Sequence, residues 1–465
     1  MTTESLQDKL ARHGDAVGML RANKGGSYPF PVPREHTNWR DEQEAWRTTA
    51  TLFDQSHHMT DIYFKGPDIH RLLADFGVNS FATFGRNKGK QFVAVNEEGD
   101  FIGDAILFGL EDDEFSLVGT PTLPNWIAYN AETGGYDVEV RRDERSASVE
   151  QEGRSTYRYQ IQGPLALKII EKASGGTLPD IRFFNIGEFT IAGTPVRALN
   201  HTMTGVPGEE FTGLEMWGPI EHGQRVLAAI VEAGEEFGMR RGGALSYAST
   251  TLESGWIGLP VPAIYTAPSL KAYREHLPAT GYEAASTLGG SFFSTDIEDY
   301  YLSPWDLGYG RLIHWEHDFL GRDALLRRKD ESHRVKVGLA WQREDVSEAF
   351  LSALFADDDN RTRYFELPSI PFSTFQYDSV RVGDRLVGVS TRAGYNTNLR
   401  DFASLAMLDE SVARVGAEVV VTWGSTTVAR RSPTWRSTFP SRSGQRSPGS
   451  SERGGAAGRG RRRGR

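Results

Sequence analysis

One stretch of thirty residues, 90–119, constrains the fold of this chain more than any other. It reads KQFVAVNEEGDFIGDAILFGLEDDEFSLVG, with apolar or alternating runs separated by turns rich in Gly, Asp and Glu. Short runs between such turns are typical of consecutive β-hairpins. We therefore expect a set of antiparallel strands here, and the fold that we assign must include it.

Other segments add strands and a few helices around these hairpins. Residues 157–174 predict a strand, a Gly-Pro turn and a helix, and residues 183–205 predict further strands. Residues 221–239, EHGQRVLAAIVEAGEEFGM, predict an amphipathic helix that ends at a glycine. Because helices and strands do not alternate as regular βαβ repeats, the fold class that we expect is α+β.

The second half of the chain changes character twice. Short strands between residues 331 and 425 predict a small β-barrel or sandwich, interrupted by a polar insertion. Residues 426–465 consist mostly of Ser, Arg, Gly and Pro, with eleven arginines from Arg430 onward against one acid, Glu452. This composition predicts a basic disordered tail. We interpret it as solvated chain or as the end of a shifted reading frame, in preference to a contact with RNA or an anionic surface.

Charge and composition exclude several classes of site and partner. The 52 basic and 62 acidic residues give a formal net charge of −10, which argues against nucleic acid as the main partner. The absence of cysteine rules out disulfides, iron–sulfur clusters and a thiol nucleophile. We find neither a signal peptide pattern nor an apolar run of membrane-spanning length. We therefore expect a cytoplasmic protein without a membrane partner, whose oligomeric state the sequence leaves open.

Two adjacent histidines, His57 and His58, stand in the segment LFDQSHHMTDIYFKGPD, which has the pattern of a strand. Neighbours on a strand point to opposite faces, so these two side chains cannot easily share one metal ion. No HExxH or HxH pattern accompanies them. We expect no metal site. One inward-facing histidine is the alternative, with either a functional or a packing role.

Three further residues have side chains suited to chemistry. Glu215 lies between Leu214 and Met216, and a buried carboxylate there needs donors, such as the two parallel N–H groups of a pterin or guanine edge. Tyr247 stands among small residues and, with an ordinary pKa of about 10, still carries a proton at neutral pH. Trp256 follows a glycine and offers a ring for a planar ligand. For Tyr247 and Trp256 the alternative is ordinary aromatic packing. For Glu215 the alternative is an outward-facing side chain on a half-exposed strand, and the segment taken by itself favours that alternative.

Taken in order, several segments resemble the successive blocks of the aminomethyltransferase family, whose type member is the glycine-cleavage T-protein. The resemblance covers about residues 15–425 and rests on NEEGDFIGDAILFGLEDDEFSLVG, YQIQGP, TGLEMWGP, LAAIVEAGEEFGM, LGYGRLIHWEHDFLGRDAL and VGVSTRAGYNTNL. Other segments look like the tetrahydrofolate-dependent aryl O-demethylases that act on vanillate, syringate and related methoxyarenes. These segments are LFDQSHHM, NSFATFGRNKGKQFV, NWIAYNAETGGYDV and LESGWI.

The resemblance implies a fold and a reaction. The fold is three-lobed around a central funnel for tetrahydrofolate. Residues 1–330 would form a folate-binding region of two interleaved α+β lobes, and residues 331–425 a C-terminal β-barrel domain. The reaction would move a methyl group from a small methoxylated aromatic to N5 of tetrahydrofolate, which gives a phenol and 5-methyltetrahydrofolate.

The resemblance also implies roles for individual residues. Tyr247 would be the catalytic acid, with His58 near the substrate or returning the proton. Glu215 would grip the pterin, with Trp256 and Asp104 as further cofactor-binding residues. The substrate-binding residues would be Tyr28, Gln55 and Thr120.

Two departures from the family pattern bear on the substrate. T-proteins carry an Asp-Asp pair where this chain has Gly103-Asp104, which counts against glycine-cleavage chemistry. Relatives that demethylate methoxybenzoates carry an arginine after LVG, where this chain has Thr120. The carboxylate would then be held elsewhere, or the substrate would lack one. Alternative functions are an aminomethyltransferase, a demethylase of small sulfonium or ammonium compounds, and a non-catalytic folate-binding protein.

Overall fold

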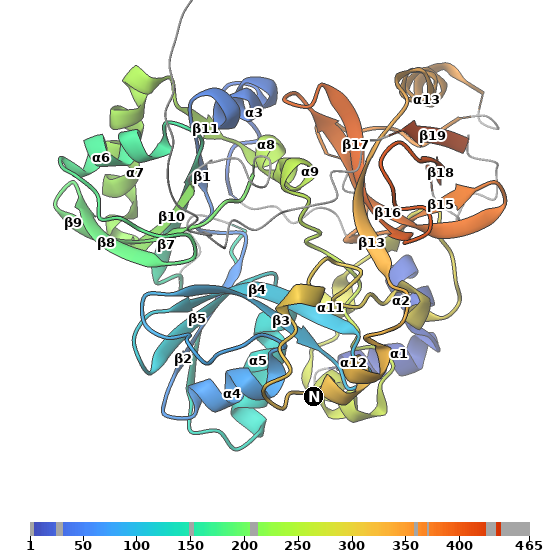
Figure 1. Cartoon of the computed structure of the whole chain (residues 1–465), viewed down its shortest axis with the longest axis horizontal. Coiled ribbons are helices and arrows are strands. Elements are labelled where there is room, and N and C mark those ends of the chain that lie inside the picture. Colours follow the sequence, from blue (N-terminus) through green and yellow to red (C-terminus); the bar gives the residue numbers. More distant parts are fainter. Residues whose placement is uncertain are drawn as a thin grey trace, which may run out of the picture.

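Three β-sheets, each the centre of one lobe, organise the computed structural model of this protein (Figure 1). The structure describes residues 4–24, 31–147, 153–204, 213–357, 361–369 and 372–424, and the backbone of residues 434–438. Helices and sheets are mixed along the chain, so the expected α+β class and the three lobes are confirmed. None of the helices in these ranges is long and apolar enough to cross a bilayer.

The first lobe is built on a six-stranded sheet with an apolar and a polar face. Its strands, in spatial order, are β11 (Arg240–Gly242), β1 (Thr51–Asp54), β7 (Thr156–Gln162), β10 (Gly213–Pro219), β9 (Thr194–Asn200) and β8 (Ile186–Ile191). Residues such as Leu52, Ile161 and Leu214 alternate to one face and form a buried core with the helices α6 (Ala166–Ser174) and α7 (Gly223–Gly234). The opposite face carries Phe53, Gln160 and Glu215, which stand side by side in the register.

The second lobe contains the hairpins that residues 90–119 predict. Its five-stranded antiparallel sheet has the order β3 (Gly89–Val95), β4 (Phe101–Gly109), β5 (Glu114–Gly119), β2 (Thr60–Lys65) and β6 (Glu139–Asp143). Its helices are α4 (Ile69–Phe76) and α5 (Thr122–Thr133). The central strands β4, β5 and β2 are almost entirely buried because the two helices and the central connections cover them, whereas the edge strand β6 is largely exposed.

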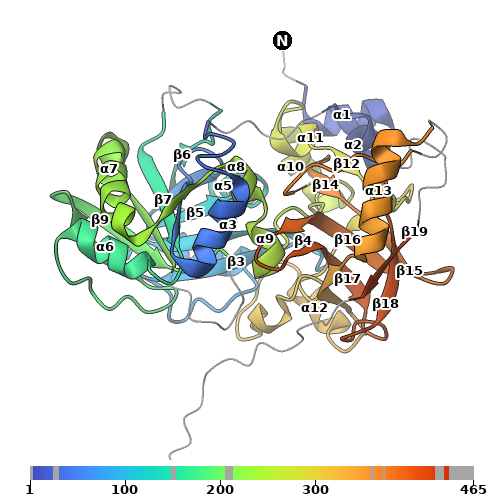
Figure 2. The ribbon, with the colours of Figure 1, turned by 90° about the horizontal axis from the view of Figure 1, so that it is seen from above.

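The third lobe is a curled antiparallel sheet of six strands. Their order is β13 (Arg334–Ala340), β17 (Asp401–Asp409), β16 (Arg385–Asn396), β15 (Asp378–Val382), β18 (Glu418–Thr422) and β19 (Thr434–Thr438). The polar insertion contains the helix α13 (Arg343–Phe355), which lies beside this sheet (Figure 2). The strand β19 pairs with β18 inside the stretch for which we predicted disorder, so that prediction is wrong for residues 434–438. The other residues after 424 lie outside the described ranges.

Short elements fill the space where the lobes meet. They are α1 (Leu6–His13), α2 (Ala16–Ala22), α3 (Trp39–Thr48), α8 (Ala244–Ala248), α9 (Thr250–Ser254), α10 (Lys271–His276), α11 (Tyr282–Ala285), β12 (Leu288–Gly289), α12 (Arg322–Arg328) and β14 (Phe375–Gln376). In both views α8 and α9 lie centrally, between the first and third lobes (Figures 1 and 2). Glu253 of α9 connects the helix α3 to the third lobe, because it accepts hydrogen bonds from Trp46 and Arg47 of α3 and from Asn398, which follows β16.

The histidine segment differs from its prediction. Residues 51–54 and 60–65 are separate strands in two different sheets, and residues 55–59 form the turn between them. His57 and His58 therefore do not alternate on one strand. The turn still separates the two rings: Nδ1 of His57 lies 2.6 Å from the Ser146 hydroxyl, whereas His58 faces α8.

Candidate active site

The turn between β1 and β2 meets α8 above the polar face of the first sheet. Here Nε2 of His58 lies 2.5 Å from the hydroxyl of Tyr247, and the two rings meet edge to face at 4.7 Å. Phe53 packs against the other side of the tyrosine ring at 5.6 Å. Gly243 precedes α8 and lies against the backbone of Arg34 and Glu35, where a Cβ atom would clash. Close packing of this segment therefore fixes the position of Tyr247.

Protonation states in this pair follow from burial. Burial lowers the pKa of His58 to about 4, against the opposing effect of the Glu215 charge. Burial and the same negative charge raise the pKa of Tyr247 well above its usual range. A hydrogen bond between the His58 ring and the backbone of Gln55 leaves Nε2 free to accept. At neutral pH, a protonated tyrosine therefore donates to a neutral histidine.

Gln55 lies against the same tyrosine. Its Nε2 donates to Sδ of Met203 at 2.7 Å and lies 3.5 Å from the Tyr247 hydroxyl. Its Oε1 is buried without a hydrogen-bond partner among the described residues. On the adjoining strand β7, Oε1 of Gln160 and Nε2 of Gln162 are also buried without a hydrogen-bond partner among the described residues. Buried polar atoms are rarely left unpaired, so this face has the character of a surface that receives a polar ligand.

Glu215, on the same face, is ionised and held by two side chains. Nη1 of Arg158 donates to its Oε1 at 2.6 Å, and Nε2 of His201 lies 2.6 Å from its Oε2. Burial alone would raise the pKa of this carboxyl, but Arg158 and His201 outweigh it and lower the pKa to about 2. Arg158 also donates to Asp61 at 3.0 Å, which completes a buried charged network.

A second cluster surrounds Asp104 of β4. Its Oδ2 accepts hydrogen bonds from the Tyr309 hydroxyl at 2.6 Å, from Nε1 of Trp256 at 2.9 Å and from Nε2 of Gln91 at 2.8 Å. Burial raises the pKa of Asp104, although the hydrogen bonds from Tyr309 and Trp256 oppose the shift. Trp256 remains 39% exposed, so part of this residue is accessible to a ligand.

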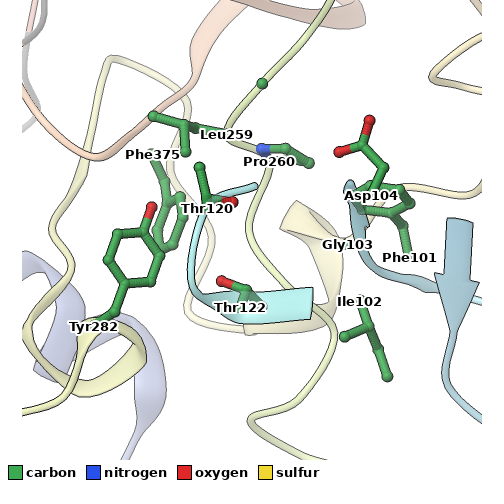
Figure 3. A pocket seen from close by; sticks show the side chains of 11 residues that line it. Phe101, Ile102, Gly103, Asp104, Thr120, Thr122, Leu259, Pro260, Tyr282 and Phe375 are labelled. Atoms are coloured by element: carbon green, nitrogen blue, oxygen red, sulfur yellow. The ribbon is translucent and has the colours of Figure 1, made fainter. Parts of the chain in front are cut away.

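Asp104 and Thr120 line one cavity, together with Tyr282 and Phe375 (Figure 3). Thr120 follows β5, whose last residue, Gly119, pairs with Thr60 at the start of β2. Thr120 is therefore close in space to the turn that carries His58. The segment 244–256 links the two clusters, because Tyr247 lies near its start and Trp256 at its end.

The predicted site residues thus fall into two neighbouring groups. The first contains Gln55, His58, Glu215 and Tyr247, and the second contains Asp104, Thr120 and Trp256. Tyr28 lies outside the described residues. No group of three or more side chains suited to metal binding occurs in the ranges that the structure describes.

Sequence reasoning missed the partners that hold these residues. Arg158, His201 and Met203 contact the predicted residues from other strands and loops. Arg158 could have been found, because an arginine in the apolar alternation of YRYQIQ needs a buried acid. His201 and Met203 follow β9 in a loop, and their positions carry no comparable signal.

Comparison with known proteins agrees with this architecture. Residues 2–259 match the family model described as the GCVT N-terminal domain. The chain is 41% identical to a syringate O-demethylase from Sphingobium sp., over 93% of this chain and 92% of that protein. It is 26% identical to a sesamin methylene transferase from Sinomonas sp., over 84% and 86% of the two chains.

A solved structure supports the fold independently. Aminomethyltransferase T of the glycine cleavage system from Bartonella henselae superposes with a TM-score of 0.61, over 90% of this chain and 93% of that one, at 17% sequence identity. On the strength of the family model and of its relatives, this chain belongs to the aminomethyltransferase family.

Proposed function

We propose that this protein is a tetrahydrofolate-dependent O-demethylase that moves a methyl group from a methoxylated aromatic compound to N5 of tetrahydrofolate. The observation that carries the proposal is the 2.5 Å contact between His58 and the Tyr247 hydroxyl, beside the ionised Glu215. A protonated phenol positioned by a neutral histidine suits cleavage of an aryl ether. The 41% identity to a syringate O-demethylase supports the same reaction.

The residues present fit a reduced folate. The amide groups of Gln55, Gln160 and Gln162 include three buried atoms without a partner among the described residues. Each Glu215 oxygen accepts one hydrogen bond from the protein and keeps a second lone pair for a ligand N–H. The partly exposed side chain of Trp256 could stack against a planar ring. When bound, tetrahydrofolate supplies the amine that accepts the methyl group.

Tyr247 acts as the general acid in this proposal. As the bond between the aryl oxygen and the methyl carbon breaks, its electron pair stays on oxygen, and Tyr247 donates the proton that makes a neutral phenol. Acid assistance of this kind typically contributes a factor of about 10² to 10⁴ in rate. His58 orients the hydroxyl through its Nε2 atom, and it or a water chain returns the proton.

The raised pKa of Tyr247 has two consequences for this step. The phenol is protonated throughout the physiological pH range, so the acid is always present. The tyrosinate is costly, however, because burial and the charge of Glu215 both disfavour it. Proton donation must therefore accompany C–O cleavage and be followed at once by reprotonation.

Packing around Gly103 argues against the alternative of glycine-cleavage chemistry. A Cβ atom at this position would lie 2.9 Å from Cβ of Leu123, which is closer than such atoms approach. The aspartate that T-proteins carry here would not fit this backbone without a shift of α5. Because Asp104 alone remains, the second carboxylate of the T-protein pattern has no place in this site.

The test is a turnover assay with defined products. Purified protein, tetrahydrofolate and one of vanillate, syringate, 3-O-methylgallate or guaiacol are incubated, and products are identified by mass spectrometry. We expect 5-methyltetrahydrofolate and the matching phenol in equal amounts with at least one substrate. Folate binding without turnover of any of them would contradict the proposal and favour a sulfonium or ammonium substrate.

A further inference from the structure

A β-bulge in the third lobe places one arginine in an unusual backbone conformation. In the pairing of β16 with β17, Thr391 faces Leu405 and Gly394 faces Ala403, so Arg392 and Ala393 together oppose the single residue Ser404. Arg392 has a φ of 52°, in the left-handed region that residues other than glycine rarely adopt. Bulges turn a side chain away from the regular pleat and are common beside functional sites.

The side chain of Arg392 is half-buried and has no acidic partner among the described residues. It makes no hydrogen bond or ion pair with any residue that the structure describes, whereas Arg158 and Arg154 each donate to Asp61. Burial lowers the pKa of Arg392, but an arginine keeps its charge at neutral pH. Partial removal of a charge from water without a counter-ion carries a cost. Such a side chain is retained without a partner when a ligand supplies the opposite charge.

Arg392 stands next to the cavity that contains Thr120. Its charge lowers the pKa of the Tyr282 hydroxyl, against the larger effect of burial, which raises that pKa to about 12. Tyr282 lines the cavity together with Thr120 (Figure 3). The guanidinium of Arg145 lies over the same tyrosine ring, 4.9 Å from its centroid. Two cations therefore flank Tyr282.

The cavity is electrically asymmetric. Figure 3 places Asp104 and Tyr282 on opposite sides of it. Asp104 is surrounded by donors from Trp256, Tyr309 and Gln91. The Tyr282 side has the two arginines and the hydroxyl of Thr120 beside one acid, Glu283, which accepts a hydrogen bond from Asn125. An aromatic acid would enter with its carboxylate toward Tyr282, because two arginines face it there.

We propose that Arg392 binds the carboxylate of the aromatic substrate, with the hydroxyls of Thr120 and Tyr282 as neighbouring donors. This inference rests on the proposed function and names the substrate class, a methoxybenzoate. It also explains why Thr120 can stand where relatives that demethylate methoxybenzoates carry an arginine. In this chain, Arg392 of the third lobe would bind the carboxylate instead. Guanidinium groups bind carboxylates through two parallel hydrogen bonds, which orients the ring as well as holding it.

The experiment compares two substrates that differ only in the carboxylate, syringate and 2,6-dimethoxyphenol, in wild type and Arg392→Gln. A hydrogen bond to a charged group contributes about 1.5–3 kcal/mol, so kcat/KM for syringate should fall roughly 10- to 100-fold. The loss should appear mainly in KM, and kcat/KM for 2,6-dimethoxyphenol should change less than about twofold. Equal losses on both substrates, or none on syringate, would overturn the inference.

Two further variants separate recognition from folding. Arg392→Lys keeps the charge but not the fork of donors, so it should retain part of the preference for syringate. Arg363→Met removes another half-buried arginine of the same lobe, which stacks on Phe372. It should leave the preference unchanged. Thermal unfolding shows whether Arg392→Gln folds. If it does not, the test is the ratio of kcat/KM for syringate to kcat/KM for 2,6-dimethoxyphenol in Arg392→Lys. A ratio equal to that of the wild type would refute the role of Arg392.

Equilibrium binding separates this inference from the proposed function. Syringate is titrated calorimetrically into each protein without tetrahydrofolate, so the readout does not need turnover. Binding that disappears in Arg392→Gln supports the carboxylate site even if the wild type demethylates nothing. Demethylation of syringate by wild type and Arg392→Gln with the same KM would leave the proposed function standing and refute the inference.

Discussion

His58 and Tyr247 are separated by 189 positions in the sequence, yet Nε2 of the histidine lies 2.5 Å from the tyrosine hydroxyl. The contact joins a turn between two sheets to a short helix of the central connection. Its chemistry depends on a histidine that stays neutral and a phenol that stays protonated, and burial favours both.

Removal of the Tyr247 hydroxyl should abolish most of the catalysis. We expect Tyr247→Phe to lower kcat about 10² to 10⁴-fold, the range of general acid catalysis. Tetrahydrofolate affinity should stay within a few-fold, because no cofactor contact is assigned to this hydroxyl. Steady-state kinetics and fluorescence titration measure the two effects. The control is Tyr273→Phe, whose buried hydroxyl has no partner among the described residues and which should keep full activity. Near-normal turnover by Tyr247→Phe would refute the assignment.

His58 should make stability depend on pH in a defined window. Burial lowers its pKa from an ordinary value of about 6.5 to about 4 in the folded chain. Between these values the unfolded chain binds more protons, so this contribution to stability is present above pH 6.5 and is lost as the pH falls to 4. The difference in unfolding free energy between wild type and His58→Gln should therefore change by about 3 kcal/mol across the window. Urea unfolding at a series of pH values measures it, and a constant difference would contradict the pKa shift.

Glu215 should matter for both stability and folate binding. Glu215→Gln removes the charge that Arg158 and His201 face, which leaves the buried guanidinium of Arg158 with less compensation. Breaking a buried pair in this way costs about 3 kcal/mol or more, and here Asp61 still partners Arg158. We also expect at least a tenfold loss of tetrahydrofolate affinity in a binding titration. Glu188→Gln, in a surface pair with Arg197, serves as the control and should change stability by less than about 0.5 kcal/mol.

Asp378 in the third lobe should give the opposite pH dependence. Burial raises its pKa from an ordinary value near 3.8 to about 7, although Gln376 and the backbone of Ser291 donate to it. Between these values the folded chain binds more protons, so this contribution to stability is fully present below pH 4 and is lost as the pH rises to 7. Asp378→Asn should be more stable relative to wild type at pH 8 than at pH 4, by about 4 kcal/mol, in chemical denaturation. If the difference in unfolding free energy between Asp378→Asn and wild type does not grow from pH 4 to pH 8, the Asp378 carboxyl is ionised across this range in the folded chain.

Local sequence patterns predicted most of the sheets but not how their polar side chains pair. The hairpins of residues 90–119 and the helix α7 followed from alternation and from glycine stops, which are local signals. The break at residues 55–59 was missed because two short strands with a polar turn have the pattern of one longer strand. The strand β19 was missed because the composition around it is that of a disordered segment.

The sequence suggested the candidate site as a set of residues, but it did not predict their geometry. Glu215 stood out because a carboxylate between Leu214 and Met216 needs donors, but the donors that the structure reveals are Arg158 and His201. Such partners depend on which strands become neighbours, which alternation cannot give. Arg392 carried no sequence signal at all, since its position depends on a bulge and a left-handed φ.

Tracing of the methyl carbon tests the central claim most directly. Syringate with ¹³C in its methoxy groups is incubated with the protein and tetrahydrofolate, and both products are followed by mass spectrometry. Our account predicts one labelled 5-methyltetrahydrofolate for each 3-O-methylgallate formed, with no labelled methanol. Release of the label as methanol or formaldehyde, or binding of tetrahydrofolate with no transfer at all, would contradict it.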